Sequence, residues 1–573
     1  MRLRRHNLID TETDPVRPDK PKDFDVVGAR TPDGTFNDLS EPQMGAAGAR
    51  FARNVALSST YGETAPKLFD PSPRLISNKL LARHEFVPVP YLNVLVPAWI
   101  QFMVHDWLSH GKNVSTDPHV VPLPDGDDWP GGEMTVPRTR PDCKTGPNDA
   151  DRPPTFRNVE TSWWDGSQIY GSSAERLKVV RAGGGDALPA DGKIQLGEGD
   201  LLPIDAAAAD PNIELAGVNG NWWVGLSVLH TLFAREHNAV VDRLKVEHPE
   251  ADGEWLFNKA RLVVSALIAK IHTVEWTPAL MNSPVGRAAM RGNYWGIAGE
   301  RTWLDRGRLS ESEVVSGIPG SPQEHHGAPY AMTEEFAAVY RLHSLMPDDF
   351  KFRSADNDAM LFEEDLHGVA GGKVPDLYRR ASFNDVLYSL ATMNCGALVL
   401  NNYPHALRRL PKSHGKHMID LAAVDILRDR ERGVPRFSEF RRLTGMRVPK
   451  TFADITDDEA WQKALEEVYG TVDKVDLLIG TLAESKSTNG QPPGFGFSDT
   501  AFRIFILMAS RRLKSDRFFT DDFRPEIYTR AGFDWVTNNG LKSVIDRHAP
   551  ALSIAYKDAR NPFFLWRRAE VRT

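Results

Sequence analysis

The chain has 573 residues, with 69 lysines and arginines against 77 aspartates and glutamates, which gives a formal net charge of −8. Its charged fraction of 25% and hydrophobic fraction of 41% are those of a globular protein and exclude a mainly disordered or collagen-like chain. The mildly acidic balance argues against nucleic-acid binding, which needs clustered lysine and arginine. Two cysteines, Cys143 and Cys395, are too few for a disulfide framework or a cysteine-based metal cluster.

The N-terminal segment MRLRRHNLIDTETDPVRPDK carries basic residues with no apolar core behind them, so we expect no signal peptide. The longest uncharged run, 86–104, is long enough to raise the question of a membrane span. Pro88, Pro90 and Pro97 would break a helix in its first half. We therefore predict a cytoplasmic protein without a span, whose segment 86–100 can make peripheral contact with a lipid surface.

Residues 1–65 are polar, rich in proline and glycine and without lasting periodicity, which predicts an N-terminal arm. The remainder, 66–573, has few alternating strand patterns and no repeat or linker that would divide it. It is therefore predicted to form one large, mainly α domain with little strand. Apolar residues recur at helical spacing over 98–110, 226–244, 254–275, 334–345, 384–400, 498–514 and 541–547.

The first candidate site is Gln101-Phe-Met-Val-His105-Asp106-Trp107. Gln101 and His105 are four residues apart, so on a helix they share one face. An imidazole beside an amide can take a proton from a bound peroxide and return it to the leaving oxygen. A buried histidine with ordinary hydrogen bonds explains the same residues, and the motif alone favours that simpler interpretation.

A second candidate is the loop NVETSWWDGSQIYG, which carries side-chain oxygens at alternating positions. Such a loop suits Ca²⁺, which takes six to eight oxygen ligands. The oxygen donors in question are those of Asp106, Thr161, Trp163 through its carbonyl, Asp165 and Ser167. Asp-Gly-Ser is also common turn chemistry, and on these residues alone an ordinary turn is preferred.

Two further patterns concern a tyrosine and an acid-binding group. Tyr340 and His343 are three apart in TEEFAAVYRLHSLMPD and would share one face of the helix predicted there. His272, Thr277 and Arg512 lie near the ends of two predicted helices, and a guanidinium with a histidine and a hydroxyl can hold a carboxylate. Core packing is the commoner explanation of the first pair, and surface arginines that interact favourably with the helix dipole are the better explanation of the second pattern taken alone.

Six blocks in this order resemble the fatty-acid α-dioxygenases of plants and bacteria, within the peroxidase–cyclooxygenase superfamily of haem proteins. They are AWIQFMVHDW, WWDGSQIYG, VGLSVLHTLFAREHNAV, ALIAKIHTVEWTPAL, TEEFAAVYRLHSLMPD and FFTDDFRPEIYTRAGFDWV. The resemblance runs from about residue 75 to about 550. It implies a single large cyclooxygenase-like haem-peroxidase domain.

The resemblance also implies roles for individual residues. His105 corresponds to the distal histidine with Gln101 beside it, His343 to the proximal ligand of a b-type haem, and Tyr340 to the radical-bearing tyrosine. His272, Thr277 and Arg512 correspond to the group that holds the substrate carboxylate. Asp106, Thr161, Trp163, Asp165 and Ser167 correspond to the superfamily's calcium site.

The implied reaction uses a fatty acid, O₂ and a peroxide activator. A tyrosyl radical removes a hydrogen atom from C2 of a medium- to long-chain acid, and O₂ adds to give a 2-hydroperoxy acid, which can lose CO₂ to give a shorter aldehyde. Residues that attach haem covalently in halide-oxidising relatives are replaced here by Asn219, Trp222 and Trp223. The haem is therefore expected to be non-covalent.

Two other functions stay open at this point. A haem peroxidase that oxidises small aromatic donors with H₂O₂ would use the same distal and proximal histidines, with Tyr340 as a core residue. A haemless scaffold would use the fold for binding alone. Oxygen consumption with fatty acids, peroxide consumption with a reductant, and the haem absorption band distinguish the three.

Overall fold

Helices are the main secondary structure of the protein, a computed structural model that describes residues 2–11, 18–142, 149–183, 191–411, 418–484, 496–557 and 559–569. The predicted mainly α class with little strand is confirmed. The longer helices are α3 (Leu95–Trp107), α5 (Ala174–Val180), α6 (Val224–Glu247), α7 (Gly253–Ile271), α9 (Pro284–Trp295), α10 (Gly299–Arg306), α13 (Val374–Arg380), α14 (Phe383–Thr392), α15 (Leu421–Glu431), α16 (Phe437–Leu443), α17 (Glu459–Tyr469), α18 (Leu477–Ala483), α19 (Asp499–Lys514), α21 (Arg530–Asn538) and α22 (Leu541–His548). Shorter ones include α1 (Arg2–His6), α2 (Pro73–Ile76), α4 (Ser167–Tyr170), α8 (Thr277–Met281), α11 (Glu313–Ser316), α12 (Glu334–Val339), α20 (Pro525–Tyr528), the 3₁₀ turn η7 (His343–Leu345) and the π-helical turns η3 (Ser77–Leu81) and η6 (His272–Trp276).

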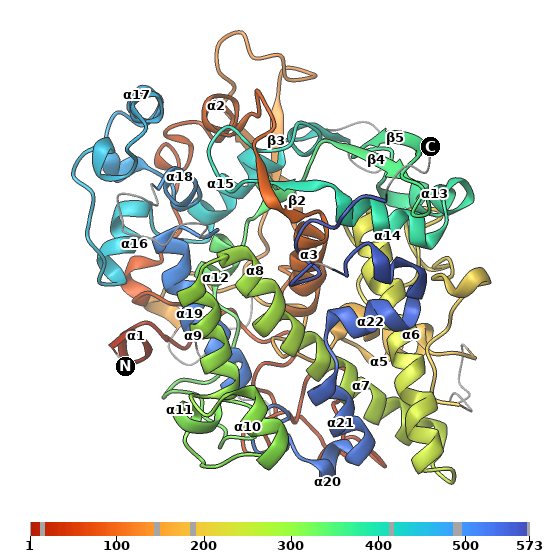
Figure 1. The fold of residues 1–573 in the computed structure, drawn as a ribbon. Helices are drawn as coiled ribbons and strands as arrows, with labels where there is room; N and C mark the ends of the chain where they lie inside the picture. The colour runs from red at the N-terminus through yellow and green to blue at the C-terminus, as the bar shows by residue number, and fades with distance from the viewer. Residues whose placement is uncertain are drawn as a thin grey trace.

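The centre of the molecule is built from α3, α6 and α7, which are buried over most of their length. Helices that are apolar on nearly all sides are expected in the interior of a large domain. Figure 1 shows α3 near the middle of the molecule, with α6 and α7 on one side and α12 and α19 on the other. Helix α6 packs against α3 and α7, and α12 packs against α19. Side chains from segments far apart in the sequence therefore meet around α3.

The strands are short, and in the described part of the chain they pair two by two in antiparallel ribbons. The pairs are β1 (Pro88–Asn93) with β6 (Asn394–Gly396), β2 (Val114–Val121) with β3 (Met134–Arg138), β4 (Asp349–Arg353) with β5 (Met360–Asp365), and β7 (Leu410–Pro411) with β8 (Met418–Ile419). The β1–β6 pair ties the chain that enters α3 to the chain that leaves α14.

Most of the apolar run is internal, but Val87, Pro88 and Pro90 are exposed, so the lipid contact expected of 86–100 stays a prediction. Side chains from Leu92 to Ile100 are buried in the main hydrophobic core. Pro97 lies in the first turn of α3, where its missing N–H costs no helical hydrogen bond. None of the helices in the described residues has the length and hydrophobicity of a transmembrane span. The cytoplasmic location stays a prediction.

The segment 1–65 is mostly irregular and lies against the helices. Several of its apolar side chains join the main hydrophobic core, and a backbone bridge links Ala52 to Thr333, just before α12. The division of the chain at residue 65 stays a prediction. Of the two cysteines, Cys395 is a buried free thiol, and Cys143 lies outside the described residues.

Two predicted helices end earlier than expected. The helix predicted over 334–345 ends before Tyr340, and His343 opens the separate turn η7. The physical reason is Arg341, whose guanidinium pairs with two carboxylates of α15 at 2.6 and 2.8 Å and draws the chain out of a helical path. The predicted common helical face of Tyr340 and His343 is therefore wrong. The helix predicted over 384–400 gives way to β6, because pairing with β1 outweighs local helical preference.

Candidate active site

The distal candidates lie on α3 in consecutive turns. Gln101 and His105 share a face, as their spacing predicts. Both ends of the Gln101 amide are held by the segment that precedes α6. Its Nε2 donates to the carbonyl oxygen of Asn221 at 3.0 Å, and its Oε1 accepts from Nε1 of Trp223 at 2.8 Å. These two hydrogen bonds fix the orientation of the amide.

His105 is half-buried, with one ring nitrogen turned into the protein. Its Nδ1 has no hydrogen-bond partner among the residues that the structure describes. Burial lowers the pKa of His105 to about 4, so the imidazole is uncharged at neutral pH. An uncharged imidazole has one nitrogen that can accept a proton, as an acid–base catalyst requires.

Tyr340 and His343 lie where α12 gives way to η7, and η7 contacts α3. Tyr340 is 7% exposed and stacks on Phe336, with ring centroids 4.2 Å apart. Burial raises the pKa of Tyr340 well above its ordinary value, against the opposing charge of Arg512, so the phenol keeps its proton. The His343 side chain is 34% exposed, as suits a ring that is accessible to a ligand.

Asp425 on α15 is a site residue that the sequence reasoning missed. Its Oδ2 lies 2.9 Å from Nδ1 of His343, and its two oxygens also accept from Arg341 at 2.6 Å and from Tyr403 at 3.0 Å. Burial opposes ionisation, but the charges of His343 and Arg341 hold the pKa of Asp425 below its ordinary value. Because Nδ1 lies beside this carboxylate, Nε2 is the nitrogen that His343 can offer to a metal. No local pattern marks Asp425, because it is distant from His343 in the sequence.

Arg512 lies near the C-terminal end of α19 and is 1% exposed, so its interpretation as a surface arginine is wrong. Its guanidinium carbon lies 3.4 Å from the ring centre of Trp107 and 4.3 Å from that of Trp164. Within the described part of the chain, its Nε and Nη2 have no hydrogen-bond acceptor. Because a buried charge without a partner is unfavourable, this arrangement is suited to binding an anion.

His272, the first residue of η6, faces the same two indoles. Its ring centroid lies 5.3 Å from that of Trp107 and 5.2 Å from that of Trp164. Nε1 of Trp99 donates to Nδ1 of His272 at 3.2 Å, so the uncharged ring carries its proton on Nε2. Burial, and then the charge of Arg512, lower the pKa of His272 well below its ordinary value. His272 is therefore a neutral donor beside a cationic one.

Thr277 is joined to His272 through the backbone. Its hydroxyl donates to the carbonyl oxygen of His272 at 2.9 Å, five residues earlier. A π-helical turn accommodates one extra residue and is often found at functional sites. The structure thus links Thr277 to His272, and it links His272 to Arg512 through Trp107 and Trp164.

Trp107 also connects the acid-binding group to the tyrosine. Its ring lies 6.1 Å from that of Tyr340, centroid to centroid, and 6.0 Å from that of Phe336. The sequence reasoning included Trp107 only as part of the distal motif and assigned it no role. One buried indole therefore separates the Arg512 guanidinium from the Tyr340 phenol.

Asp106 meets the Asp-Gly-Ser loop through buried hydrogen bonds. The backbone N–H of Ser167 donates to Oδ1 of Asp106 at 2.6 Å, and the hydroxyl of Thr161 donates to Oδ2 of Asp165 at 2.9 Å. Burial, and then the charge of Asp165, raise the pKa of Asp106 well above its ordinary value. Burial also raises the pKa of Asp165, although Arg261, 3.4 Å away, opposes it. Two buried carboxylates that repel each other suit a cation site.

Trp163 anchors this loop, since its Nε1 donates to the carbonyl oxygen of Gly34 at 3.0 Å. The described residues contain no group of three or more histidine, cysteine, aspartate or glutamate side chains arranged to hold a metal. A cation bound here would therefore depend on hydroxyl and carbonyl oxygens as well as on the two carboxylates, which is the donor chemistry of Ca²⁺.

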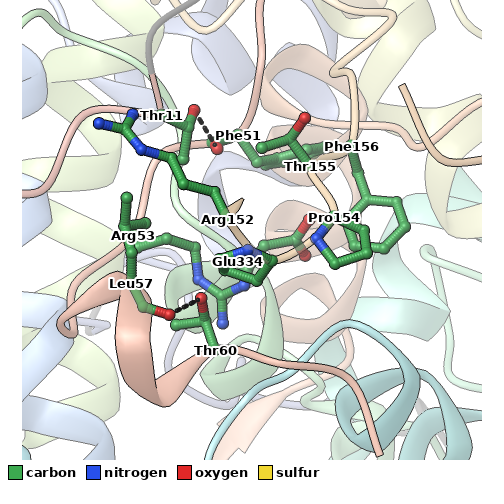
Figure 2. A pocket seen from close by; sticks show the side chains of 11 residues that line it. Thr11, Phe51, Arg53, Leu57, Thr60, Arg152, Pro154, Thr155, Phe156 and Glu334 are labelled. Atoms are coloured by element: carbon green, nitrogen blue, oxygen red, sulfur yellow. Dashed lines mark hydrogen bonds between the residues drawn. The ribbon is translucent and has the colours of Figure 1, made fainter. Parts of the chain in front are cut away.

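A separate cavity adjoins α12 at Glu334 (Figure 2). Glu334 is buried there, and both of its carboxylate oxygens lie 3.0 Å from Nε2 of His110. Arg53 also lines this cavity, and its guanidinium is held by Glu335 at 2.8 Å. The lining includes none of the distal, proximal or acid-binding residues, so this cavity belongs to the support of α12.

Comparison with known proteins identifies the family of this chain. The model of the animal haem peroxidase family matches residues 29–560. The α-dioxygenase PIOX of Oryza sativa is 37% identical over 94% of this chain and 86% of its own length. Alpha-dioxygenase 2 of Arabidopsis thaliana is 37% identical over 95% of this chain and 85% of its own.

Solved structures give the same result. The crystal structure of the rice fatty-acid α-dioxygenase has a TM-score of 0.89 and 36% identity, covering 98% of this chain and 91% of its own. A tyrosine-to-phenylalanine variant of that enzyme with palmitic acid has a TM-score of 0.88 at 35% identity, with the same coverage. Peroxidase A from Dictyostelium discoideum, at 21% identity and a TM-score of 0.73, shares the fold. The resemblance recognised in the six sequence blocks is confirmed: the chain belongs to the fatty-acid α-dioxygenase family, within the animal haem peroxidases.

Proposed function

We propose that this chain is a haem-dependent fatty-acid α-dioxygenase that converts a medium- to long-chain acid and O₂ into a 2-hydroperoxy acid. The observation that carries the proposal is the buried guanidinium of Arg512, whose Nε and Nη2 lack an acceptor among the described residues, beside the indole that contacts Tyr340. A carboxylate would supply the missing acceptor and charge. The palmitic acid in the rice variant structure supports a fatty acid as the ligand.

The residues of this chain fit a haem. His343 would hold the iron through Nε2, because its Nδ1 contacts Asp425 and its ring is partly exposed. Asn219, Trp222 and Trp223 replace the residues expected for covalent attachment, so we propose non-covalent b-type haem. The indoles of both tryptophans are already engaged, with Glu214 at 2.9 Å and Gln101 at 2.8 Å. When bound, the haem supplies the one-electron oxidant for Tyr340.

The chain's own residues then move protons and a hydrogen atom. His105 accepts a proton from the activating peroxide and returns it to the leaving oxygen, with Gln101 beside it. Tyr340 loses one electron and its phenolic proton, and the phenoxyl oxygen removes the hydrogen atom from C2 of the acid. O₂ adds to the carbon radical, and the peroxyl radical takes a hydrogen atom back from Tyr340, which regenerates the phenoxyl radical.

Regiochemistry follows from where the carboxylate is held. Arg512 would bind it through Nε and Nη2, and His272 would donate from Nε2–H, while Thr277 offers a hydroxyl oxygen in the same turn. Orientation of C2 next to the phenol can contribute about 7–11 kcal/mol relative to free encounter. Each methylene buried in an apolar environment adds about 0.8 kcal/mol, which favours longer acyl chains.

We also propose calcium in the loop after the distal helix. The ligands would be Asp106, Thr161, Trp163 through its carbonyl, Asp165 and Ser167. The support for this site is the pair of buried, mutually repelling carboxylates and the surrounding oxygen donors. Such an ion would tie α3 to the loop, and so fix the position of His105.

Oxygen uptake by the haem-loaded protein tests the activity. We expect O₂ consumption with saturated acids of graded length, and a product that is two oxygen atoms heavier and oxidised at C2. The control is the matched fatty alcohol, which lacks the carboxylate. A protein that consumes H₂O₂ with an aromatic reductant, but no O₂ with any acid, would be a peroxidase instead.

A further inference from the structure

The strongest observation that the proposed reaction leaves unexplained concerns His230 on α6. It is 2% exposed, and its Nε2 has no hydrogen-bond partner in the part of the chain that the structure describes. Nδ1 of His105, on α3, likewise has no hydrogen-bond partner among the described residues. Each uncharged imidazole has one N–H donor and one lone-pair acceptor, so two unpaired ring nitrogens can satisfy each other. Buried polar atoms are rarely left without a partner.

The two histidines lie on the facing sides of packed helices. Phe102 and His105 are three apart, so they share a face of α3. The Phe102 ring meets the His230 ring edge-on, with centroids 4.8 Å apart and planes at 86°. Burial, and then the proximity of His105, lower the pKa of His230 well below its ordinary value. His230 lines a small cavity with Gln195 and apolar residues such as Ile169, and this cavity has room for a water molecule beside the imidazole.

We infer that His230 is a positioning residue for His105, whose Nδ1–H donates to Nε2 of His230 through one bridging water. This hydrogen bond selects the tautomer of His105 that leaves Nε2 as the proton acceptor. The other tautomer would present an N–H toward the peroxide and could not take its proton. The contact also stabilises His105 after it has accepted the proton. The inference rests on the distal role proposed for His105.

Cyanide binding to the ferric haem form tests this without turnover. Hydrogen cyanide must give up its proton before the anion binds, so its association rate reports the distal base. We expect His230→Phe, which keeps an aromatic ring without an acceptor, to slow association at neutral pH by about tenfold or more, within the range of general-base effects. His230→Gln retains an acceptor and should recover most of the rate.

Carbon monoxide binding to the ferrous form needs no proton transfer and should be unchanged in His230→Phe, which excludes a blocked pocket. His237→Phe is the matched control, since His237 is buried on the same helix and bonds Tyr170 and the Gly192 carbonyl instead. If His230→Phe does not load haem, His230→Leu and His230→Gln give the same comparison.

A wild-type cyanide rate in a haem-loaded variant without an acceptor would overturn the inference. His105→Phe separates this failure from that of the distal assignment. Slow cyanide binding in His105→Phe with a normal rate in His230→Phe would refute only the role of His230. A normal rate in His105→Phe would refute the distal role itself, and with it the inference.

Discussion

The guanidinium carbon of Arg512 lies 3.4 Å from the centre of the Trp107 indole and 4.3 Å from that of Trp164, in the loop before α4. A cation that lies against two indole rings is held in position by electrostatic attraction and by packing, without needing a carboxylate from the protein. The Nε and Nη2 donors of Arg512 therefore stay available for a ligand. Trp107 also contacts Tyr340, so the same indole sets the spacing between the bound acid and the phenol.

Arg512→Lys should weaken fatty-acid binding by about 1.5–3 kcal/mol, the range for a hydrogen bond to a charged group. Lysine keeps the positive charge but lacks the planar guanidinium, and so loses its hydrogen-bonding geometry and its packing against the two indoles. Affinity can be measured by the spectral titration of the haem-loaded protein with palmitate. Arg511→Lys is the matched control, because Arg511 is equally buried but donates to the carbonyls of Ala328 and Pro329. Equal losses in the two variants would mean that Arg512 is only structural.

Tyr340→Phe should bind haem and palmitate but lose O₂ uptake by about 100-fold or more, since the hydrogen-abstracting oxygen is missing. The phenylalanine ring preserves the stack on Phe336, so folding should be little changed. Tyr388→Phe, a buried tyrosine on α14 that bonds Asp358, serves as the control. Product formation by Tyr340→Phe at the rate of that control would assign the radical to another residue.

Asp425→Asn should raise the midpoint potential of the haem iron by tens of millivolts, because His343 loses the negative partner that makes it a stronger donor. The asparagine keeps the shape and an acceptor oxygen. Spectroelectrochemical titration measures the change, and Asp429→Asn, which removes the other partner of Arg341, controls for the lost ion pair. An unchanged potential in Asp425→Asn would show that the contact does not influence the ligand.

Acid should destabilise the protein through Glu334. Burial opposes its ionisation, but His110 and nearby arginines lower the pKa of Glu334 to about 2, against an ordinary value of 4.5. A carboxylate with a lowered pKa contributes stability that is complete above the ordinary value and is lost as the pH falls toward the lowered one. The shift corresponds to about 3 kcal/mol.

The measurement is urea unfolding at pH values on both sides of this window. Glu334→Gln should be less stable than the wild type at neutral pH, and the difference should shrink as the pH falls from about 4.5 to about 2. If the free energies of unfolding of the wild type and Glu334→Gln differ by the same amount over that whole pH range, Glu334 is not the source of the acid sensitivity.

Calcium removal should lower the melting temperature if the loop after α3 binds the ion. Binding only to the folded state stabilises it by about 2.7 kcal/mol at a hundredfold excess over Kd, so in a chain of this length EGTA should lower the melting midpoint by about 2 °C. Asp165→Asn should abolish the EGTA effect. A midpoint insensitive to EGTA and restored Ca²⁺ in the wild type would exclude the site.

Sequence periodicity predicted where most central helices lie, because their apolar residues repeat over many turns. It overextended the helix through Tyr340, since the ion pairs of Arg341 with α15 are tertiary contacts that no local pattern contains. The same limit hid Asp425, which approaches His343 only through folding. The sequence showed Trp107 as part of the distal motif, but its contacts with Arg512 and Tyr340 form only when three segments distant in the sequence pack together.

The motif spacing also concealed the turn at His272. A regular α-helix advances about 100° per residue, so one residue added or removed rotates everything downstream by that amount. Deletion of Val274 would convert η6 to regular helix and rotate α8 about the helix axis. This rotation would move the Thr277 hydroxyl away from the His272 carbonyl that it now binds. The presence of one residue in this turn therefore determines whether the Thr277 hydroxyl can reach the His272 carbonyl.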